Sequence, residues 1–208
     1  MSAESVVCGG SATAGKIIHP GWVRVCHWIN ALAILVMIGS GWQVYNASPL
    51  FNFTFPKEIT LGGWLGGALL WHFAAMWMLV INGIAYVTLG LVTGRFRRKL
   101  LPIYPSEVFA DIKAALTFKL AHDDISRYNA VQKVLYAGVI LCGVLIVLSG
   151  LAIWKPVQFQ ELATLFGGYD FARYVHFFAM AAIVGFLVVH VLLALLLPKS
   201  LRAMVSGR

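Results

Sequence analysis

Long apolar stretches alternate with short polar ones along this chain, and the charged residues mark the boundaries between them. Four windows contain no Asp, Glu, Lys or Arg: residues 25–56, 59–94, 134–154 and 174–198. Each window can hold the roughly 20 residues that a helix needs to cross the hydrocarbon layer of a bilayer. The pattern predicts an all-α integral membrane four-helix bundle with four spans: about 22–45, 68–91, 134–154 and 171–197.

The connections between these spans are short, apart from a middle segment at residues 100–132. Ser106 can cap a helix there, and four apolar residues follow at helical spacing: Phe109, Ile112, Leu116 and Leu120. Because charged residues lie between them, we expect a short amphipathic cytoplasmic helix between spans two and three, lying on the membrane surface and covering the cytoplasmic ends of the bundle. Pro198 is expected to end span four. No internal repeat and no separate soluble domain is evident, so residues 1–208 are predicted to form one transmembrane domain.

The charged residues are few, and their distribution predicts the orientation of the chain. Hydrophobic residues make up 60% of the sequence and charged residues 12%. A soluble domain carries roughly twice that charge, which excludes a soluble enzyme, a disordered chain and a secreted disulfide scaffold. Of the 16 Lys and Arg residues, 13 lie in the terminal and middle segments. By the positive-inside rule both termini are cytoplasmic. The net charge of +8 is therefore a topology signal and does not indicate nucleic-acid binding.

Four of the six histidines lie within the predicted spans, where ionisable residues favour a functional site. His27 opens span one on the cytoplasmic side, and His72 lies in the first part of span two, which starts outside. His176 opens span four outside, and His190 follows 14 residues later, about 21 Å deeper and on the same helix face. We therefore expect two pairs: His72 with His176 on the external side, and His27 with His190 on the cytoplasmic side.

Paired imidazoles that face each other across a helix bundle suit the iron of a porphyrin, whose apolar ring belongs in the bundle interior. A zinc site would favour further ligands such as Cys, Asp or Glu, and a proton relay would need carboxylates; no acidic residue lies in any span. Arg24 and Arg173 precede His27 and His176 by three residues, which places a cation one turn nearer the water for a haem propionate. Arginines that anchor a helix at the interface would show the same spacing.

Other residues in and near the spans have less specific assignments. His19 and His122 are expected to be solvated and are not predicted as ligands. The cysteines lie on the cytoplasmic side or inside a helix, so no structural disulfide is expected, and no C-x-x-C-H motif attaches a haem covalently. Seven glycines in the spans allow either close approach to a porphyrin or close helix packing: Gly39, Gly41, Gly83, Gly138, Gly143, Gly150 and Gly185.

These residues resemble a known family, the transmembrane dihaem cytochrome b subunits of nickel–iron hydrogenases and formate dehydrogenases. The 14-residue spacing of the two histidines in span four matches it, as do three segments: H-P-G-W-V-R-V-C-H-W-I-N at 19–30, W-H-F-A-A-M-W at 71–77 and Y-N-A-V-Q-K-V-L-Y at 128–136. The resemblance implies that the four histidines ligate two b haems with the pairing given above. It also implies a location in the bacterial inner membrane.

The same resemblance implies an electron relay between a periplasmic redox enzyme and the membrane quinone pool, of menaquinone or ubiquinone. The partner would be a hydrogenase, a formate dehydrogenase or a molybdopterin enzyme. The quinone would bind near the cytoplasmic haem, with Asn129 and Gln132 as contacts. Asn129 is equally suited to cap span three. The ending of span two, G-R-F-R-R-K-L-L-P at 94–102, resembles the cytochromes that serve molybdopterin enzymes.

Two other functions remain open from the sequence. A self-sufficient cytochrome b would pass electrons between quinone and a small external oxidant such as superoxide, but the external segments carry balanced charge, which would not attract an anion. A non-redox membrane scaffold would use the histidines as hydrogen bonds between helices. The chain has no nucleophile and base pair and no phosphate loop, so we expect an electron-transfer subunit. The sequence leaves the partner enzyme, the direction of electron flow and a homo-oligomeric state open.

Overall fold

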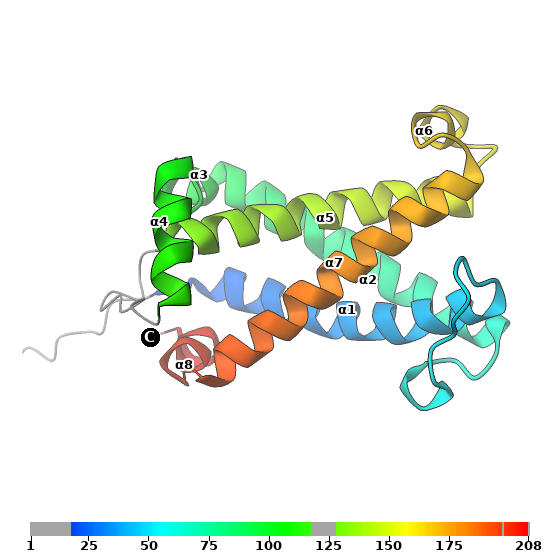
Figure 1. Ribbon diagram of the computed structural model, residues 1–208, viewed down its shortest axis with the longest axis horizontal. Helices are drawn as coiled ribbons and strands as arrows, with labels where there is room; N and C mark the ends of the chain where they lie inside the picture. Colours follow the sequence, from blue (N-terminus) through cyan, green and yellow to red (C-terminus); the bar gives the residue numbers. More distant parts are fainter. Residues whose placement is uncertain (1–17, 118–127, 197, 208) are drawn as a thin grey trace, which may run out of the picture.

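The computed structural model describes residues 18–117, 128–196 and 198–207. Four long helices run along its longest axis (Figure 1), and the described residues contain no strand. These helices are α1 (Gly21–Ala47), α2 (Leu65–Val92), α5 (Ala130–Trp154) and α7 (Tyr169–Leu196). All four are long and apolar enough to cross a membrane. The prediction of an all-α bundle with four spans is confirmed, and each boundary lies within four residues of the expected one.

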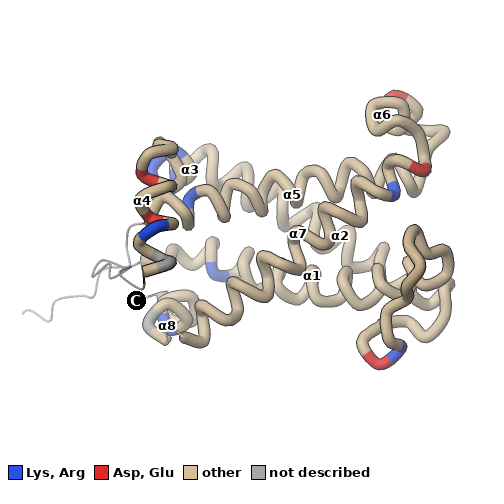
Figure 2. Tube along the Cα trace, in the orientation of Figure 1, with Lys and Arg blue, Asp and Glu red and all other residues tan. Residues whose placement is uncertain are grey.

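The four long helices expose large apolar side chains and bury small ones, which is the reverse of a soluble bundle. Leu70 and Leu141 are 74% and 69% exposed, whereas Ala68, Ala152 and Ala172 are fully buried. Small residues let helices approach closely in lipid, where large apolar side chains gain nothing by leaving the surface. Figure 2 shows the charged residues gathered toward the two ends of the bundle. The chain therefore has the surface of a membrane-spanning protein.

Short helices lie at the two ends of the bundle (Figure 1). At one end, the α6 end, they are η1 (Lys57–Ile59) and α6 (Gln160–Leu165). At the other end, the α4 end, they are α3 (Arg95–Lys99), α4 (Pro105–Leu116) and α8 (Pro198–Ser206). Helix α7 is described as far as Leu196, and Pro198, which was predicted to end the fourth span, begins α8, as suits a proline in the first turn of a helix.

Helix α4 forms at the position predicted for an amphipathic helix and crosses the ends of the long helices (Figure 1). Its residues Phe109 and Ile112 are 73% and 42% exposed. On another face, a carboxylate oxygen of Asp111 accepts a hydrogen bond from the backbone N–H of Ala130 at 2.7 Å. Helix α4 is thus tied to the first turn of α5, while its placement on a membrane surface stays a prediction. Leu120 lies outside the described residues.

Close backbone packing between the long helices is confined to two hairpins in the described part of the chain. Helix α1 packs against α2, and α5 packs against α7. No spanning helix of one hairpin packs along a spanning helix of the other. The bundle is therefore an assembly of two hairpins that meet mainly through side chains.

The two hairpins repeat one arrangement, so the expectation of no internal repeat was wrong. The first helix of each hairpin carries a Ser-Gly pair, at residues 40–41 in α1 and 149–150 in α5. The eighth residue of the second helix is a histidine in each hairpin, His72 in α2 and His176 in α7. A buried alanine lies four residues before each histidine and another three residues after it: Ala68 and Ala75 in α2, and Ala172 and Ala179 in α7. The sequence signal is A-x-x-x-H-F-x-A, which occurs at 68–75 and again at 172–179.

The two ends of the described chain meet at the α4 end. The backbone N–H of Ile18 donates to the carbonyl of Gly207 at 2.9 Å. His19 is only 9% exposed, and its Nδ1 lies 3.3 Å from a guanidinium nitrogen of Arg95. Burial, together with the positive charges of Arg95 and Lys99, lowers the pKa of His19 to about 4. The expectation that His19 is solvated was therefore wrong, and His122 lies outside the described residues.

Candidate functional site: two histidine pairs

The structure brings the four predicted histidines together in the two expected pairs. His72 of α2 faces His176 of α7 with ring centres 6.5 Å apart, and these residues form the first pair. His27 of α1 faces His190 of α7 with ring centres 6.0 Å apart, and these residues form the second pair. In both pairs the ring planes are steeply inclined to each other, by 60° and 64°.

The spacing of both pairs fits one metal ion held between two imidazoles. An imidazole nitrogen binds a metal ion at about 2 Å, so two rings on opposite sides of one ion have centres about 6 Å apart. Among the described residues, no group of three or more His, Cys, Asp and Glu side chains could hold a metal ion. Each pair supplies two imidazoles, which suits a metal chelate that brings its own further ligands, as a haem does.

Both pairs join one hairpin to the other. His72 and His27 come from the first hairpin, and both of their partners come from α7 of the second. Since the described spanning helices of the two hairpins do not pack along each other, the space between the hairpins is left to side chains and to whatever the pairs hold. A porphyrin is the kind of flat apolar group that a bundle interior accommodates.

In the first pair, each histidine is hydrogen-bonded by a serine that no sequence argument identified. Nδ1 of His72 lies 3.1 Å from the hydroxyl oxygen of Ser40, and Nδ1 of His176 lies 3.1 Å from that of Ser149. Both hydroxyls already donate to the carbonyl four residues back, that of Val36 at 2.6 Å for Ser40. The equivalent bond of Ser149 is 2.8 Å long.

These bonds determine which ring nitrogen carries the proton. A hydroxyl has one hydrogen, and in Ser40 and Ser149 that hydrogen is used on a backbone carbonyl. The serine oxygen can therefore only accept from the imidazole, so Nδ1 of His72 and of His176 carries the proton. The lone pair of Nε2 is then free to bind a metal ion, which is the form in which histidine acts as a ligand.

The glycine beside each serine makes room for the ring. A Cβ atom at Gly41 would lie 3.3 Å from Cε1 of His72, and one at Gly150 would lie 3.2 Å from Cε1 of His176. Gly143, one heptad before Gly150 in the same helix, has nothing within 4 Å of that position. Of the two roles open for the glycines, close packing against the neighbouring helix applies at these two positions, where the group in contact is a histidine side chain.

The second pair has a different environment. His27 contacts the edge of Trp28 at 5.3 Å between ring centres, and His190 stacks on Phe186 at 5.5 Å with an angle of 13° between the planes. No described residue makes a hydrogen bond to either imidazole. The two pairs therefore differ in their hydrogen bonds: the imidazoles of the first pair each contact a serine hydroxyl through Nδ1.

The internal repeat also ends at the second pair. When the hairpins are aligned on their Ser-Gly pairs and on the histidines of the first pair, Tyr136 of α5 corresponds to His27 of α1. In the same alignment Tyr86 of α2 corresponds to His190 of α7. The bundle thus holds one histidine pair at each depth, and two tyrosines occupy the positions where symmetry would place a further pair.

The two arginines predicted near haem propionates each bind a backbone carbonyl. Arg24 donates to the carbonyl of Val205 in α8 at 2.7 Å, and its buried Nε has no hydrogen-bond partner among the described residues. Arg173 donates to the carbonyl and to the hydroxyl of Ser48, which follows α1. Arg24 thus joins α1 to α8, and Arg173 joins α7 to the segment that follows α1, while their contact with a propionate stays a prediction.

The two residues predicted as quinone contacts form a capping box at the start of α5. Oδ1 of Asn129 accepts from the backbone N–H of Gln132 at 2.7 Å, and Oε1 of Gln132 accepts from the backbone N–H of Asn129 at 3.1 Å. The capping role expected for Asn129 is confirmed. Beside the cap, burial raises the pKa of Tyr128, and the ammonium of Lys99 lies 5.8 Å from the centre of its ring.

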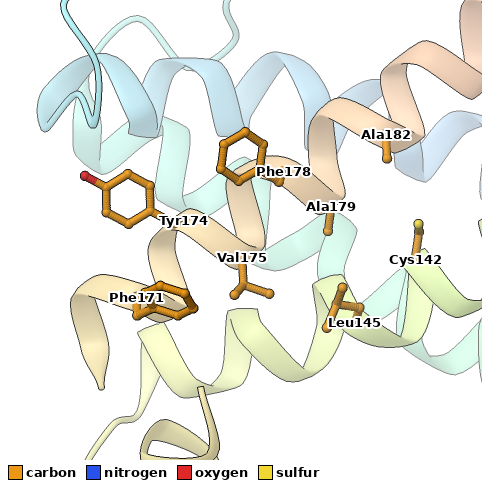
Figure 3. Close-up of a pocket in the computed structure, with 8 residues that line it drawn as sticks. All are labelled: Cys142, Leu145, Phe171, Tyr174, Val175, Phe178, Ala179 and Ala182. Carbon is orange, nitrogen blue, oxygen red and sulfur yellow. The ribbon is translucent and has the colours of Figure 1, made fainter. Parts of the chain in front are cut away.

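An apolar groove of about 630 Å³ lies between α5 and α7 (Figure 3). Cys142 and Leu145 of α5 line one wall, and residues of α7 line the other, among them Val175 and Phe178. Phe178 is 59% exposed. The groove carries no charged side chain and no imidazole, so it is an apolar surface feature and not a ligand site of either pair.

Facing histidine pairs inside a bundle with an apolar exterior are the arrangement typical of a membrane-spanning cytochrome of the b type. The chain belongs to the prokaryotic cytochrome b561 family, whose family model matches residues 18–207.

Three relatives are subunits of oxidoreductases. A protein of Azospira oryzae, provisionally named a protein-methionine-sulfoxide reductase subunit, YedZ1, is 50% identical over 91% of this chain and 96% of its own length. A provisionally named Ni/Fe-hydrogenase B-type cytochrome subunit of Cupriavidus necator is 24% identical over 92% of this chain and 84% of its own. The cytochrome b556 subunit of an Escherichia coli formate dehydrogenase is 34% identical over 40% of this chain and 39% of its own. The predicted family resemblance is confirmed.

Proposed function

We propose that this chain is a dihaem cytochrome b that carries electrons from membrane quinol to a protein-methionine-sulfoxide reductase outside the inner membrane. The observation that carries the proposal is the pair of facing imidazoles at each of two depths, both completed by α7. His176 and His190 are 14 residues apart, which is about 21 Å along a helix. The partner is proposed from the relative that is 50% identical over nearly its whole length.

The four histidines would hold one haem b at each pair through Nε2. When bound, haem b supplies a one-electron redox centre. The chain's own residues keep the imidazoles facing each other and exclude water with the apolar interior of the bundle. The overall reaction balances: a quinol that is oxidised to quinone releases two electrons and two protons, and reduction of a methionine sulfoxide to methionine and water consumes two of each.

The charge distribution supports an assignment of the reductase to one end of the bundle and of the quinone to the other. The α4 end carries most of the Lys and Arg residues of the described chain, so we place it in the cytoplasm, with the first pair near the external surface. The reductase would then dock at the α6 end. We place the quinone at the α4 end near the second pair. There the side-chain NH2 groups of Asn129 and Gln132 are donors suited to a quinone carbonyl.

Haem counting on histidine variants tests the cofactor part of the proposal. Purified protein is expected to contain two b haems per chain by the pyridine haemochrome assay. His72→Ala and His27→Ala are each expected to leave one haem, the one at the other pair. His19→Gln is the matched control, because His19 belongs to neither pair, and it is expected to retain two. A folded protein without haem, prepared with ample haem supply, would overturn the proposal.

Reoxidation kinetics test the partner. The protein is reduced with a quinol analogue and mixed with purified protein-methionine-sulfoxide reductase and a methionine sulfoxide. The absorbance of reduced b haem is expected to decay only when both the enzyme and the sulfoxide are present. If the haems are instead reduced by hydrogen in the presence of a nickel–iron hydrogenase and do not respond to the sulfoxide system, the partner assignment fails and the hydrogenase relationship is favoured.

A further inference from the structure

We propose that Ser40 and Ser149 are positioning residues of the first pair, which fix the tautomer of His72 and His176 and lower the reduction potential of the haem held there. The inference rests on the proposed function, because it concerns a haem at this pair. It deepens that function because it predicts that the two haem sites differ in reduction potential and names the two serines as the cause.

The first step is the direction of the hydrogen bonds. Each serine donates its single hydrogen to the carbonyl four residues back, that of Val36 for Ser40 and that of Leu145 for Ser149. Each serine oxygen therefore accepts from an imidazole Nδ1–H at 3.1 Å. A hydroxyl that donates to a carbonyl is polarised and becomes a better acceptor, so the two bonds strengthen each other.

The second step is the environment of these bonds. Both serines are fully buried, and they are the largest fully buried side chains of the described protein. Water cannot compete for the Nδ1 proton at such a position, and the local dielectric is low, so each hydrogen bond acts at nearly its full electrostatic strength. The adjacent Gly41 and Gly150 leave no Cβ atom that would push the ring out of reach of the hydroxyl.

The third step is the effect on a bound iron. An acceptor on Nδ1–H moves electron density toward Nε2 and makes the imidazole a stronger donor to the metal. A stronger donor stabilises the ferric state more than the ferrous state, so the reduction potential falls. Two such ligands act on the same iron at the first pair. At the second pair no described residue makes a hydrogen bond to either imidazole, and this effect is absent.

The consequence is an asymmetry between two sites whose protein ligands are otherwise alike. The haem at the first pair lies nearer the α6 end, where we place the reductase. A lower potential there makes its reduced form a stronger electron donor to that partner. The internal repeat supports a specific role for the serines, because the same serine, glycine and histidine contacts occur twice and converge on one site.

Redox titration of serine variants in the full-length holoprotein tests the proposal. Ser40→Ala and Ser149→Ala are each expected to raise the potential of one haem, the same haem in both variants. The equilibrium constant for its reduction should change several-fold per variant and by about tenfold or more in the double variant, which is 59 mV for each tenfold change. The other haem is an internal control and should not shift. Ser206→Ala, which removes a hydroxyl that also donates to the carbonyl four residues back, is the matched control in α8.

Electron paramagnetic resonance adds a second readout, at the level of the iron ligands. Loss of the Nδ1 hydrogen bond should move the g values of one low-spin ferric haem toward those of a neutral imidazole ligand, and leave those of the other unchanged. If the alanine variants lose haem, Ser40→Cys and Ser149→Cys keep the side-chain shape and replace the hydroxyl by a weaker acceptor. Their potential should move in the same direction by a smaller amount.

The outcomes separate this inference from the proposed function. Two haems with unchanged potentials in the alanine or cysteine variants would overturn the role of the serines and leave the dihaem assignment intact. A fall in potential, or an equal shift of both haems, would also overturn it. Wild-type protein without haem at the first pair would instead contradict the proposed function.

Discussion

At the scale of single residues, Gly41 and Gly150 determine how close the imidazoles of the first pair lie to the neighbouring helix. Replacing either glycine by alanine would place a methyl group 3.3 or 3.2 Å from a histidine ring. Such overpacking costs about 1–3 kcal/mol and shifts the ring by a few tenths of an ångström. We expect Gly150→Ala and Gly41→Ala to reduce haem occupancy at the first pair only, measured by the haem-to-protein ratio. Gly143→Ala, which meets nothing within 4 Å, should retain both haems; equal losses in all three would contradict this reasoning.

His19 makes the α4 end sensitive to pH. Burial and Arg95 lower the pKa of His19 from 6.5 to about 4 in the folded protein. Between these values the unfolded chain binds a proton that the folded chain does not, so stability falls as the pH is lowered from about 6.5 toward 4. The loss is at most about 1.4 kcal/mol per pH unit. We expect the melting temperature to drop more between pH 7.5 and 5 in the wild type than in His19→Gln, measured in detergent; equal drops would assign the pH dependence to other groups.

Sequence reasoning identified the four histidines but missed the serines, and the reason is physical. A histidine in an apolar span lacks a partner within its own helix, so its depth and face carry information. A serine in a helix can donate to the carbonyl four residues back and needs no other partner. Ser40 and Ser149 therefore look unremarkable in the sequence, and only their distance to Nδ1 of His72 and His176 reveals a role. The Ser-Gly pair that stands in two of the predicted spans, at 40–41 and 149–150, is the sequence signal that would have pointed to them.

At the scale of elements, α4 packs against α5, and the carboxylate of Asp111 joins the two helices by a hydrogen bond. Asp111 accepts from the backbone N–H of Ala130 and so supplies the partner that the first turn of α5 needs. Asp111→Ala should cost about 1 kcal/mol, as loss of a helix cap does. We expect faster hydrogen exchange at the Ala130 amide and along α4, measured by mass spectrometry, with unchanged exchange in α7. Glu107→Ala on the same helix is the control, and similar acceleration in both variants would point to general destabilisation of α4.

The long helices could be predicted and the arrangement of the short ones could not. The length of a segment without charged residues predicts a membrane-spanning helix, because the bilayer sets a minimum number of apolar residues. The end helices are short, and their positions depend on tertiary contacts such as the hydrogen bond from Arg24 to Val205 of α8. The solvated state expected for His19 failed for the same reason, because its burial arises from Arg95 and from the meeting of the two chain ends.

At the scale of the whole molecule, the two hairpins are held together by few direct helix contacts. Backbone packing is extensive within each hairpin and sparse between the spanning helices of different hairpins in the described protein. Each histidine pair takes one residue from each hairpin. A cofactor bound at either pair would therefore contribute to assembly of the bundle, because a ligand that binds only the assembled state stabilises it. The depth of the histidines predicted the pairing, whereas this division into hairpins needed the packing of the helices.

The arrangement in two hairpins predicts how the protein behaves when the polypeptide is cut between α4 and α5, with the break at residues 122–123. Neither half alone can complete a histidine pair, because His27 and His72 lie in the first half and both partners lie in the second. Co-expressed halves are expected to recover two haems per pair of fragments, by pyridine haemochrome assay of the co-purified complex. With His176→Ala in the second half, the complex should hold one haem, because only the pair of His27 and His190 remains. Stoichiometric haem in either half expressed alone would show that a site forms without the other hairpin, and would contradict the view that haem bridges the two.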